Sequence, residues 1–389
     1  MARSYDLVLF GATGFTGGLT AEYLAASASA GLRWALAGRN MTKLAAVRDR
    51  LGPAGAELEL LPADVTDAAS LRAVAESTRV VASTVGPYVR YGEPLVAACA
   101  AAGTDYTDLT GEPRFVDEMY LRHHETALRT GARLVHACGF DSIPADLGAY
   151  FTVGQLPEGV PLQVESFLQA SGRPSAGTVH SLVEAVGDLP AAQRAFRERR
   201  RRESRGNGRR VHLTGPLPRT HPVSVWTVPL PTLDPQVVAR SATALDRYGP
   251  DFRYAQYLAL PSPVHAAAVV AGTGALVAAA QVPALRKRIL ERWTSGEGPT
   301  EEQREAGWFS LRFTGVGGGQ RVLTEVRGDR DPGYASTAVM LAEATLCLAT
   351  DTLPETAGQV TTAVAMGDRL VERLDAAGIT FRVRGRWQD

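Results

Sequence analysis

Lysine is almost missing from this chain of 389 residues, in which Lys43 and Lys287 are the only two. Neither lysine has a tyrosine four residues before it, so the Tyr-x-x-x-Lys pair of short-chain dehydrogenases is excluded. No glycine is followed by a lysine either, which excludes a phosphate loop of the Gly-Lys type. Chemistry that depends on a lysine amine therefore has little support in this sequence.

Cysteine is scarce as well, and no two of the three cysteines, Cys99, Cys138 and Cys347, form a close pair. This spacing suggests neither a disulfide framework nor a zinc site built from cysteine. The seven histidines show no ligand spacing. His123 and His124 are adjacent on an expected helix and so point in different directions, which favours structural roles. We expect no metal site.

Net charge is absent too, because 41 Lys and Arg residues balance 41 Asp and Glu residues. Nothing in this balance suggests a nucleic-acid partner. A length of 389 residues with 45% hydrophobic content is enough to bury a sizeable core and predicts two domains. Met1-Ala2-Arg3-Ser4 leads directly into the first expected strand, so we expect no signal peptide and a cytoplasmic protein.

Glycine, by contrast, is frequent, and three glycines near the start have an informative spacing. The apolar run Leu7–Phe10 is followed by Gly11-Ala12-Thr13-Gly14-Phe15-Thr16-Gly17 and then by a helical pattern. This order of strand, GxxGxxG turn and helix is typical of a dinucleotide-binding site. The helix N-terminus would face the pyrophosphate. The expected cofactor-binding residues of this turn are Gly11, Thr13, Gly14, Phe15, Thr16 and Gly17.

The next expected strand, at 33–40, indicates which dinucleotide is bound. Arg39 stands at its end, where an NAD-binding protein would carry an Asp or Glu for the ribose. A guanidinium suits the 2′-phosphate of NADP, and Lys43 could add a second positive charge. Asn40 lies between them, and Asp64 follows the next strand near the expected adenine position. Asp64 could instead be an ordinary turn carboxylate.

Alternating strand and helix patterns continue to about residue 147. They predict an α/β fold with a doubly wound parallel sheet (Rossmann) and a ligand site at the carboxyl ends of its strands. The loop Val85-Gly86-Pro87, after an expected strand at 80–85, should lie on the nicotinamide side. We expect an NADP-binding domain at 1–147 and a second, mixed α+β domain at 148–334. C-terminal helices at 335–349 and 359–377 should pack back on the first domain.

Two further stretches allow several interpretations. Nine arginines lie between Arg194 and Arg210, against only Glu198 and Glu203; they predict a disordered loop or, alternatively, a docking patch for an acidic partner. The apolar stretch 264–285 could be a buried or domain-covering helix, a lid over a lipidic substrate, or a membrane-surface contact, which we favour least. Our hypothesis is that it shapes an apolar substrate route.

Several motifs resemble those of the saccharopine dehydrogenase-like oxidoreductases. They are the glycine-rich turn at 11–17, Ala37-Gly38-Arg39, the segment 84–88, Asp108-Leu109-Thr110-Gly111-Glu112 and the segment 138–144. Within that group, the segments 296–303 and 328–334 are similar to trans-acting enoyl reductases of actinobacterial lipid biosynthesis. The resemblance covers nearly the whole chain.

The resemblance implies hydride transfer from NADPH to an unsaturated acyl chain, which is either a small molecule or bound to a carrier. A carrier-bound substrate would make an acyl carrier protein a partner. Tyr88 and Asp141 are the candidate catalytic donors, because each follows an expected strand at the carboxyl edge. Tyr88 could instead pack beside the cofactor, and Asp141 could cap the helix that starts before Pro144.

Two other functions remain open at this point. A saccharopine-type enzyme would act on a C–N bond and would need arginines that hold substrate carboxylates. A cofactor-sensing protein would keep the dinucleotide fold and catalyse nothing. Steady NADPH consumption would exclude the second alternative.

Overall fold

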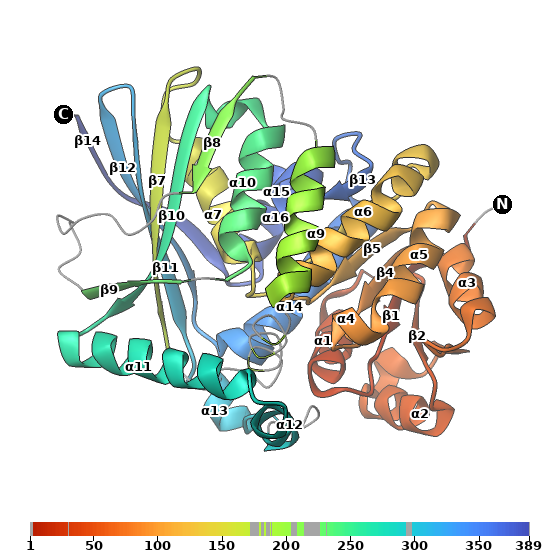
Figure 1. Cartoon of the computed structure of the whole chain (residues 1–389). Helices are drawn as coiled ribbons and strands as arrows, with labels where there is room; N and C mark the ends of the chain where they lie inside the picture. The colour runs from red at the N-terminus through yellow and green to blue at the C-terminus, as the bar shows by residue number, and fades with distance from the viewer. Residues whose placement is uncertain are drawn as a thin grey trace.

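Seven parallel strands form the first sheet of the computed structural model, on the right in Figure 1. Their order is β13-β6-β5-β4-β1-β2-β3. The structure describes residues 3–29, 31–171, 179, 183, 187, 189–203, 208–213, 226–230, 232–292 and 298–388. The strands are Tyr5–Phe10 (β1), Trp34–Gly38 (β2), Glu59–Pro62 (β3), Thr78–Ser83 (β4), Asp105–Asp108 (β5), Arg133–Val135 (β6) and Gly358–Val360 (β13).

Alternate residues of the central strands belong to two separate cores. Leu7 and Leu9 of β1 lie in one hydrophobic cluster, whereas Val8 and Phe10 lie in the other. Successive side chains of a strand point to opposite faces, so helices must cover both faces of this sheet. The first face packs on Phe15–Ser27 (α1) and Thr337–Thr350 (α14), and the second on Ala68–Ser77 (α3), Glu93–Ala102 (α5) and Pro113–Thr130 (α6). The predicted doubly wound α/β fold is confirmed.

The second sheet is mixed and has the order β14-β12-β11-β7-β10-β8, with β9 paired to β10. Its strands are Leu162–Ala170 (β7), Arg210–Leu213 (β8), Trp226–Pro229 (β9), Asp251–Leu260 (β10), Phe309–Gly317 (β11), Gln320–Gly328 (β12) and Thr380–Gln388 (β14). β10 and β7 run parallel, whereas β11 and β7 run antiparallel. Ile143–Val153 (α7) packs on this sheet, where Gly148 lies against Phe313. The boundary expected at residue 147 falls inside α7, so the division into three segments stays a prediction.

The C-terminal part of the chain contributes to both sheets. α14 packs on α1 and on β1, β4 and β5, and β13 adds an edge strand to the first sheet. β14 then pairs with β12 of the second sheet. The expectation of a single helix at 359–377 is wrong. This segment instead forms the end of β13 and two short helices, Thr362–Ala365 (α15) and Gly367–Ala376 (α16). Gly367 has φ +47°, a left-handed conformation that interrupts a right-handed helix.

The arginine-rich stretch is helical from Arg194 to Arg202 and ends in a strand, β8, at Arg210, so the expected disordered loop is wrong for these residues. Leu189–Arg202 (α9) packs against α6, and 204–207 lie outside the described residues. Arg199 is only 2% exposed, and its guanidinium binds Asp117 at 3.3 Å and Glu203 at 2.9 Å. This buried arginine and its acidic partners anchor the helix. A count of like charges along the sequence cannot predict such an anchor.

The apolar stretch 264–285 forms a helix on the outside of the molecule, along the lower edge of Figure 1. It is Pro263–Ala280 (α11), and only 6% of it is buried. The chain then turns at Gln281 and continues as Pro283–Arg292 (α12). The expectation of a buried or domain-covering helix is therefore wrong. Its composition predicted burial, but only one narrow stripe contacts the rest of the protein.

Candidate functional site

The glycine-rich turn has the shape that a pyrophosphate requires. Gly11 follows β1 with φ +99°, a conformation that favours glycine. Gly14 is the N-cap residue of α1, and within the described residues no side chain caps this helix, so its first N–H groups are available for a ligand. A Cβ atom at Gly17 would collide with the carbonyl oxygen of Gly11. The close approach of helix and turn therefore depends on glycine at both positions.

The remaining residues of the turn face outward or pack against the second domain. Thr13 is exposed, and Thr16 is half-buried with its carbonyl oxygen bonded to the hydroxyl of Thr20. The Phe15 ring meets Tyr334 edge-on at 5.0 Å, and the guanidinium of Arg304 lies 5.6 Å from its centroid. A Cβ atom at Gly298 would collide with the Phe15 ring, so both segments that resemble enoyl reductases, 296–303 and 328–334, reach the glycine-rich turn. Gly296 and Glu297, at the start of the first of these motifs, lie outside the described residues.

At the expected adenine end, Arg39 is exposed, and no hydrogen bond or ion pair engages its side chain within the described residues. Asn40 caps Met41–Arg50 (α2) by accepting a hydrogen bond from the backbone N–H of Lys43 at 2.9 Å. Asp64 accepts from both the backbone N–H and the hydroxyl of Thr66, each at 2.8 Å. These two bonds lower the pKa of Asp64, and the positive charge of Arg39 lowers it further. Asp64 thus stabilises its own turn and also lies within the field of Arg39.

On the expected nicotinamide side, the loop after β4 is tied to the glycine turn. The Thr84 hydroxyl donates to the carbonyl oxygen of Gly11 at 3.0 Å, and the Val85 side chain lies close to Gly11. The Gly86–Pro87 peptide bond that follows is cis. Val85, Gly86 and Pro87 therefore lie beside the turn, at the same edge of the sheet.

The Tyr88 hydroxyl is already engaged inside the fold. It donates to the carbonyl oxygen of Ser83 at 3.0 Å and accepts from the backbone N–H of Leu109 at 3.1 Å. Burial raises the pKa of Tyr88 well above its ordinary value, and the charge of Asp108 adds to the shift. A phenol has one proton to donate, so donation to a substrate would require the bond to Ser83 to break. The catalytic role of Tyr88 stays a prediction, and this geometry favours its alternative as a packing residue.

Asp141 is half-buried and lies near two buried carboxyl groups, those of Asp108 and Asp234. Burial raises the pKa of Asp141 to about 6, and the nearby Asp108 raises it further. Burial also raises the pKa of Asp234 to about 7, against hydrogen bonds from Gln256 and from Ser142. The N-cap position of α7 is Ser142, so Asp141 is not the cap residue of that helix. Near neutral pH this pair of carboxyls can hold and release a proton.

His136 is a candidate that the sequence reasoning missed. Its Nδ1 lies 2.7 Å from Asp108 Oδ2, and the two side chains are 3% and 0% exposed. Its Nε2 is buried and has no partner among the described residues. A carboxylate that orients an imidazole is a common acid–base arrangement. The signal lay in the sequence, because Asp108 ends β5 and His136 follows β6, and parallel neighbouring strands end at one edge.

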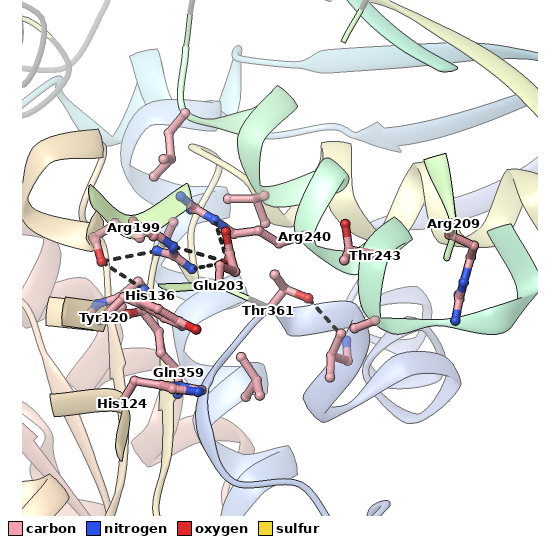
Figure 2. Close-up of a pocket in the computed structure, with 17 residues that line it drawn as sticks. Tyr120, His124, His136, Arg199, Glu203, Arg209, Arg240, Thr243, Gln359 and Thr361 are labelled. Atoms are coloured by element: carbon pink, nitrogen blue, oxygen red, sulfur yellow. Dashed lines mark hydrogen bonds and ion pairs between the residues drawn. The ribbon is translucent and has the colours of Figure 1, made fainter. Parts of the chain in front are cut away.

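His136 faces a cavity of about 310 Å³ between α6, α9, β13 and Asp234–Ala244 (α10) (Figure 2). Arg199 and Arg240 lie together on its wall, and both bind Asp117, Arg240 at 2.6 Å. Arg240 also approaches Glu203 at 3.7 Å. The cationic charge of this wall is therefore balanced by acidic partners.

The paired histidines of α6 have structural roles. His124 accepts a hydrogen bond from the backbone N–H of Gln359 at 3.0 Å and stacks on Tyr120 at 4.3 Å. His123 lies 3.4 Å from Glu93. Within the described residues, no group of three His, Cys, Asp or Glu side chains is arranged to hold a metal ion.

Comparison with known proteins identifies relatives along the whole chain. Residues 7–135 match the saccharopine dehydrogenase NADP binding domain. A trans-acting enoyl reductase of Mycobacterium tuberculosis is 39% identical, and the alignment covers 97% of each chain. One from Mycobacterium ulcerans is 38% identical, also over 97% of each chain. A second M. tuberculosis protein, for which that activity is named only provisionally, is 40% identical over 98% of this chain and 97% of its own.

A solved structure with the same fold is apo saccharopine dehydrogenase (L-Glu forming) from Saccharomyces cerevisiae. It superposes with a TM-score of 0.58 and 13% identity, covering 98% of this chain and 99% of that one. At this identity the likeness supports the fold alone. The NADP-binding assignment rests on the domain match, which fits the turn described above because that turn leaves the N–H groups of α1 free.

Proposed function

We propose that the chain, which belongs to the saccharopine dehydrogenase-like oxidoreductases and within them to the trans-acting enoyl reductase family, reduces the C=C bond of an enoyl thioester with NADPH. The observation that carries this proposal is the 38–39% identity to enoyl reductases over 97% of both chains. The acyl substrate would be lipidic and carried by an acyl carrier protein, as the description trans-acting suggests. The saccharopine dehydrogenase likeness contributes only the fold.

NADPH, when bound, would supply a hydride for the β-carbon of the substrate. The glycine turn would hold the pyrophosphate on the free N–H groups of α1. Arg39 would bind the 2′-phosphate, because it is exposed and no described residue engages its guanidinium. The residues we assign to the cofactor are Gly11, Thr13, Gly14, Phe15, Thr16, Gly17, Arg39, Asn40, Lys43, Asp64, Val85, Gly86 and Pro87.

Asp141 is our candidate proton donor. Negative charge develops on the thioester oxygen after hydride addition, and a nearby acid would neutralise the resulting enolate by protonating its α-carbon. The raised pKa of Asp141 lets it keep a proton closer to neutral pH than an ordinary aspartate does. After donation, the negative charge of Asp108 would favour uptake of a new proton by Asp141. Tyr88 remains the second candidate.

The wall of the cavity supports a reaction on a C–N bond less well than it supports enoyl reduction. A saccharopine-type substrate carries carboxylates, which arginines would have to hold. Arg199 and Arg240 are instead paired with Asp117 and Glu203, so they offer little free positive charge. Breaking such buried pairs to bind a substrate would leave acidic groups unpaired, which is costly.

An NADPH oxidation assay tests the proposal. The protein is mixed with NADPH and a trans-2-enoyl thioester, and the corresponding saturated thioester serves as the control. We expect NADPH loss only with the enoyl compound, and a product heavier by two hydrogen atoms. Turnover only with amino acid and oxo acid substrates would instead assign C–N chemistry. NADPH binding without turnover of any substrate would favour a sensing protein.

A further inference from the structure

α11 places an uncharged apolar surface in contact with solvent. Its 18 residues, PVHAAAVVAGTGALVAAA, include no Asp, Glu, Lys or Arg. Val264 is 74% exposed and Val270 is 57% exposed. A Cβ atom added to Gly272 or Gly274 would meet nothing within 4 Å. Apolar patches of this kind on a soluble protein mark an interaction site.

One narrow stripe of α11 attaches it to the rest of the molecule. Ala280 is buried and clusters with Val179 and Val183, and Leu276 packs against the same cluster. The helix also contacts β9 and β10. Figure 1 shows α11 outside both sheets, so the face opposite this stripe is free of other described elements. The helix is therefore held in place with its apolar face outward.

The next helix adds positive charge beside this surface. α12 carries Arg286, Lys287, Arg288 and Arg292 against Glu291, so its net charge is +3 (four positive less one negative). The Lys287 side chain is 78% exposed. Trp226 of β9, which contacts α11, is 56% exposed and offers the kind of aromatic ring that favours a membrane interface.

We propose that α11 and α12 attach the protein to the surface of an anionic membrane. α11 would lie in the boundary between headgroups and acyl chains, and the cations of α12 would contact anionic headgroups. α11 lies flat in this arrangement and does not span the bilayer, because both of its ends connect to elements of the same domain, β10 and α12. This inference does not depend on the proposed reaction.

Charge argues for a membrane over other occupants. A second copy of the chain docked through this region would bring two α12 helices of net charge +3 near each other, which is unfavourable. An acidic carrier protein would complement α12, but it would leave the uncharged length of α11 unexplained. An anionic bilayer satisfies both features, because it offers a hydrocarbon boundary and negative headgroups together.

Vesicle co-sedimentation of the full chain tests the proposal. We expect binding to vesicles of phosphatidylcholine with phosphatidylglycerol, and much weaker binding to phosphatidylcholine alone. The double variant Val264→Asp with Val270→Asp should lower the partition coefficient at least about tenfold, because each carboxylate opposes insertion. Lys287→Glu with Arg288→Glu should also lower it at least about tenfold, and this loss should diminish at high salt.

A matched control places the same kinds of substitution elsewhere. Leu128→Asp with Arg129→Glu alters an exposed leucine and an exposed arginine of α6, and it should bind vesicles like wild type. All variants should keep the wild-type melting temperature within a few degrees, which shows that they fold. Wild-type protein that stays in the supernatant with anionic vesicles would overturn the proposal.

Two other results would also overturn it. Unchanged vesicle binding in both double variants would show that another surface binds the lipid. Concentration-dependent dimers that the α11 variant abolishes, with no vesicle binding by wild type, would assign this face to a second copy. Turnover of a water-soluble enoyl thioester needs no vesicles, so failure of the proposed function would be seen separately.

Discussion

Arg39 is the residue on which the choice of cofactor depends. Its guanidinium is exposed and has no partner among the described residues, and it lies near Asp64, just after the second strand. We predict that Arg39→Asp lowers NADPH affinity by roughly ten- to a hundredfold, the value of one charge-assisted contact, and changes NADH affinity little. Titration calorimetry with both cofactors measures this. Arg48→Asp, a control on α2, the helix that follows Arg39, should bind NADPH like wild type, and equal affinity in Arg39→Asp would remove Arg39 from the site.

Asp141 should determine how the rate depends on pH. An acid must be protonated to donate, so turnover should be retained below about pH 6 and should fall as the pH rises through the pKa of Asp141. Asp141→Asn should lower kcat by on the order of a hundredfold and remove the pH dependence, while NADPH binding is retained. Wild-type rates in this variant would make water the proton donor.

Tyr88, unlike Asp141, should matter more for stability than for the rate, because its hydroxyl links Ser83 to Leu109 by hydrogen bonds. Tyr88→Phe leaves one buried carbonyl and one N–H without their partner. We expect it to lower the free energy of unfolding by about 1–3 kcal/mol and to change kcat by only a few-fold. Urea denaturation and steady-state kinetics separate the two effects. A hundredfold loss of kcat with unchanged stability would establish the hydroxyl as the donor.

Among the elements, α9 shows how long-range partners decide the structure of a charged segment. Arg199 reaches Asp117, 82 residues earlier in the chain. We predict that Arg199→Ala lowers the free energy of unfolding by about 3 kcal/mol or more, because Asp117 and Glu203 lose a buried partner. Arg201→Ala, at an exposed position of the same helix, should change it by less than about 0.5 kcal/mol. Similar denaturation midpoints for the two variants would mean that Arg199 does not anchor α9.

The elements of the first sheet could be predicted because their signals are local. Buried apolar runs end at glycine or polar residues, and the glycines of the turn at 11–17 stand close together in the sequence. The pairing of Asp108 with His136 was missed although both residues stand at the ends of consecutive strands, because it also depends on these two strands being neighbours in space. The exposure of α11 was missed for a similar reason, since an apolar sequence does not show which residues surround it.

At the scale of the whole molecule, an apolar substrate route predicts a preference for long acyl chains. Each CH₂ group buried on binding should raise kcat/KM by about threefold to fourfold until the route is filled. Kinetics across enoyl thioesters of increasing length, without lipid present, measure the slope. If α11 acts as a lid over the acyl chain, the double variant Val264→Asp with Val270→Asp should reduce the increase of kcat/KM with chain length. A flat profile in wild type, or a preference for small dicarboxylates, would count against the lipidic substrate.

The reaction itself is tested most directly by following the transferred hydrogen. The protein is supplied with NADPH that carries deuterium at the transferable position of the nicotinamide, together with a trans-2-enoyl thioester, and the product is analysed by mass spectrometry and NMR. We predict one deuterium at the β-carbon and one solvent hydrogen at the α-carbon, and on the order of a hundredfold less product with Asp141→Asn. Deuterium retained in the cofactor after prolonged incubation with the enoyl substrate would contradict enoyl reduction by this chain.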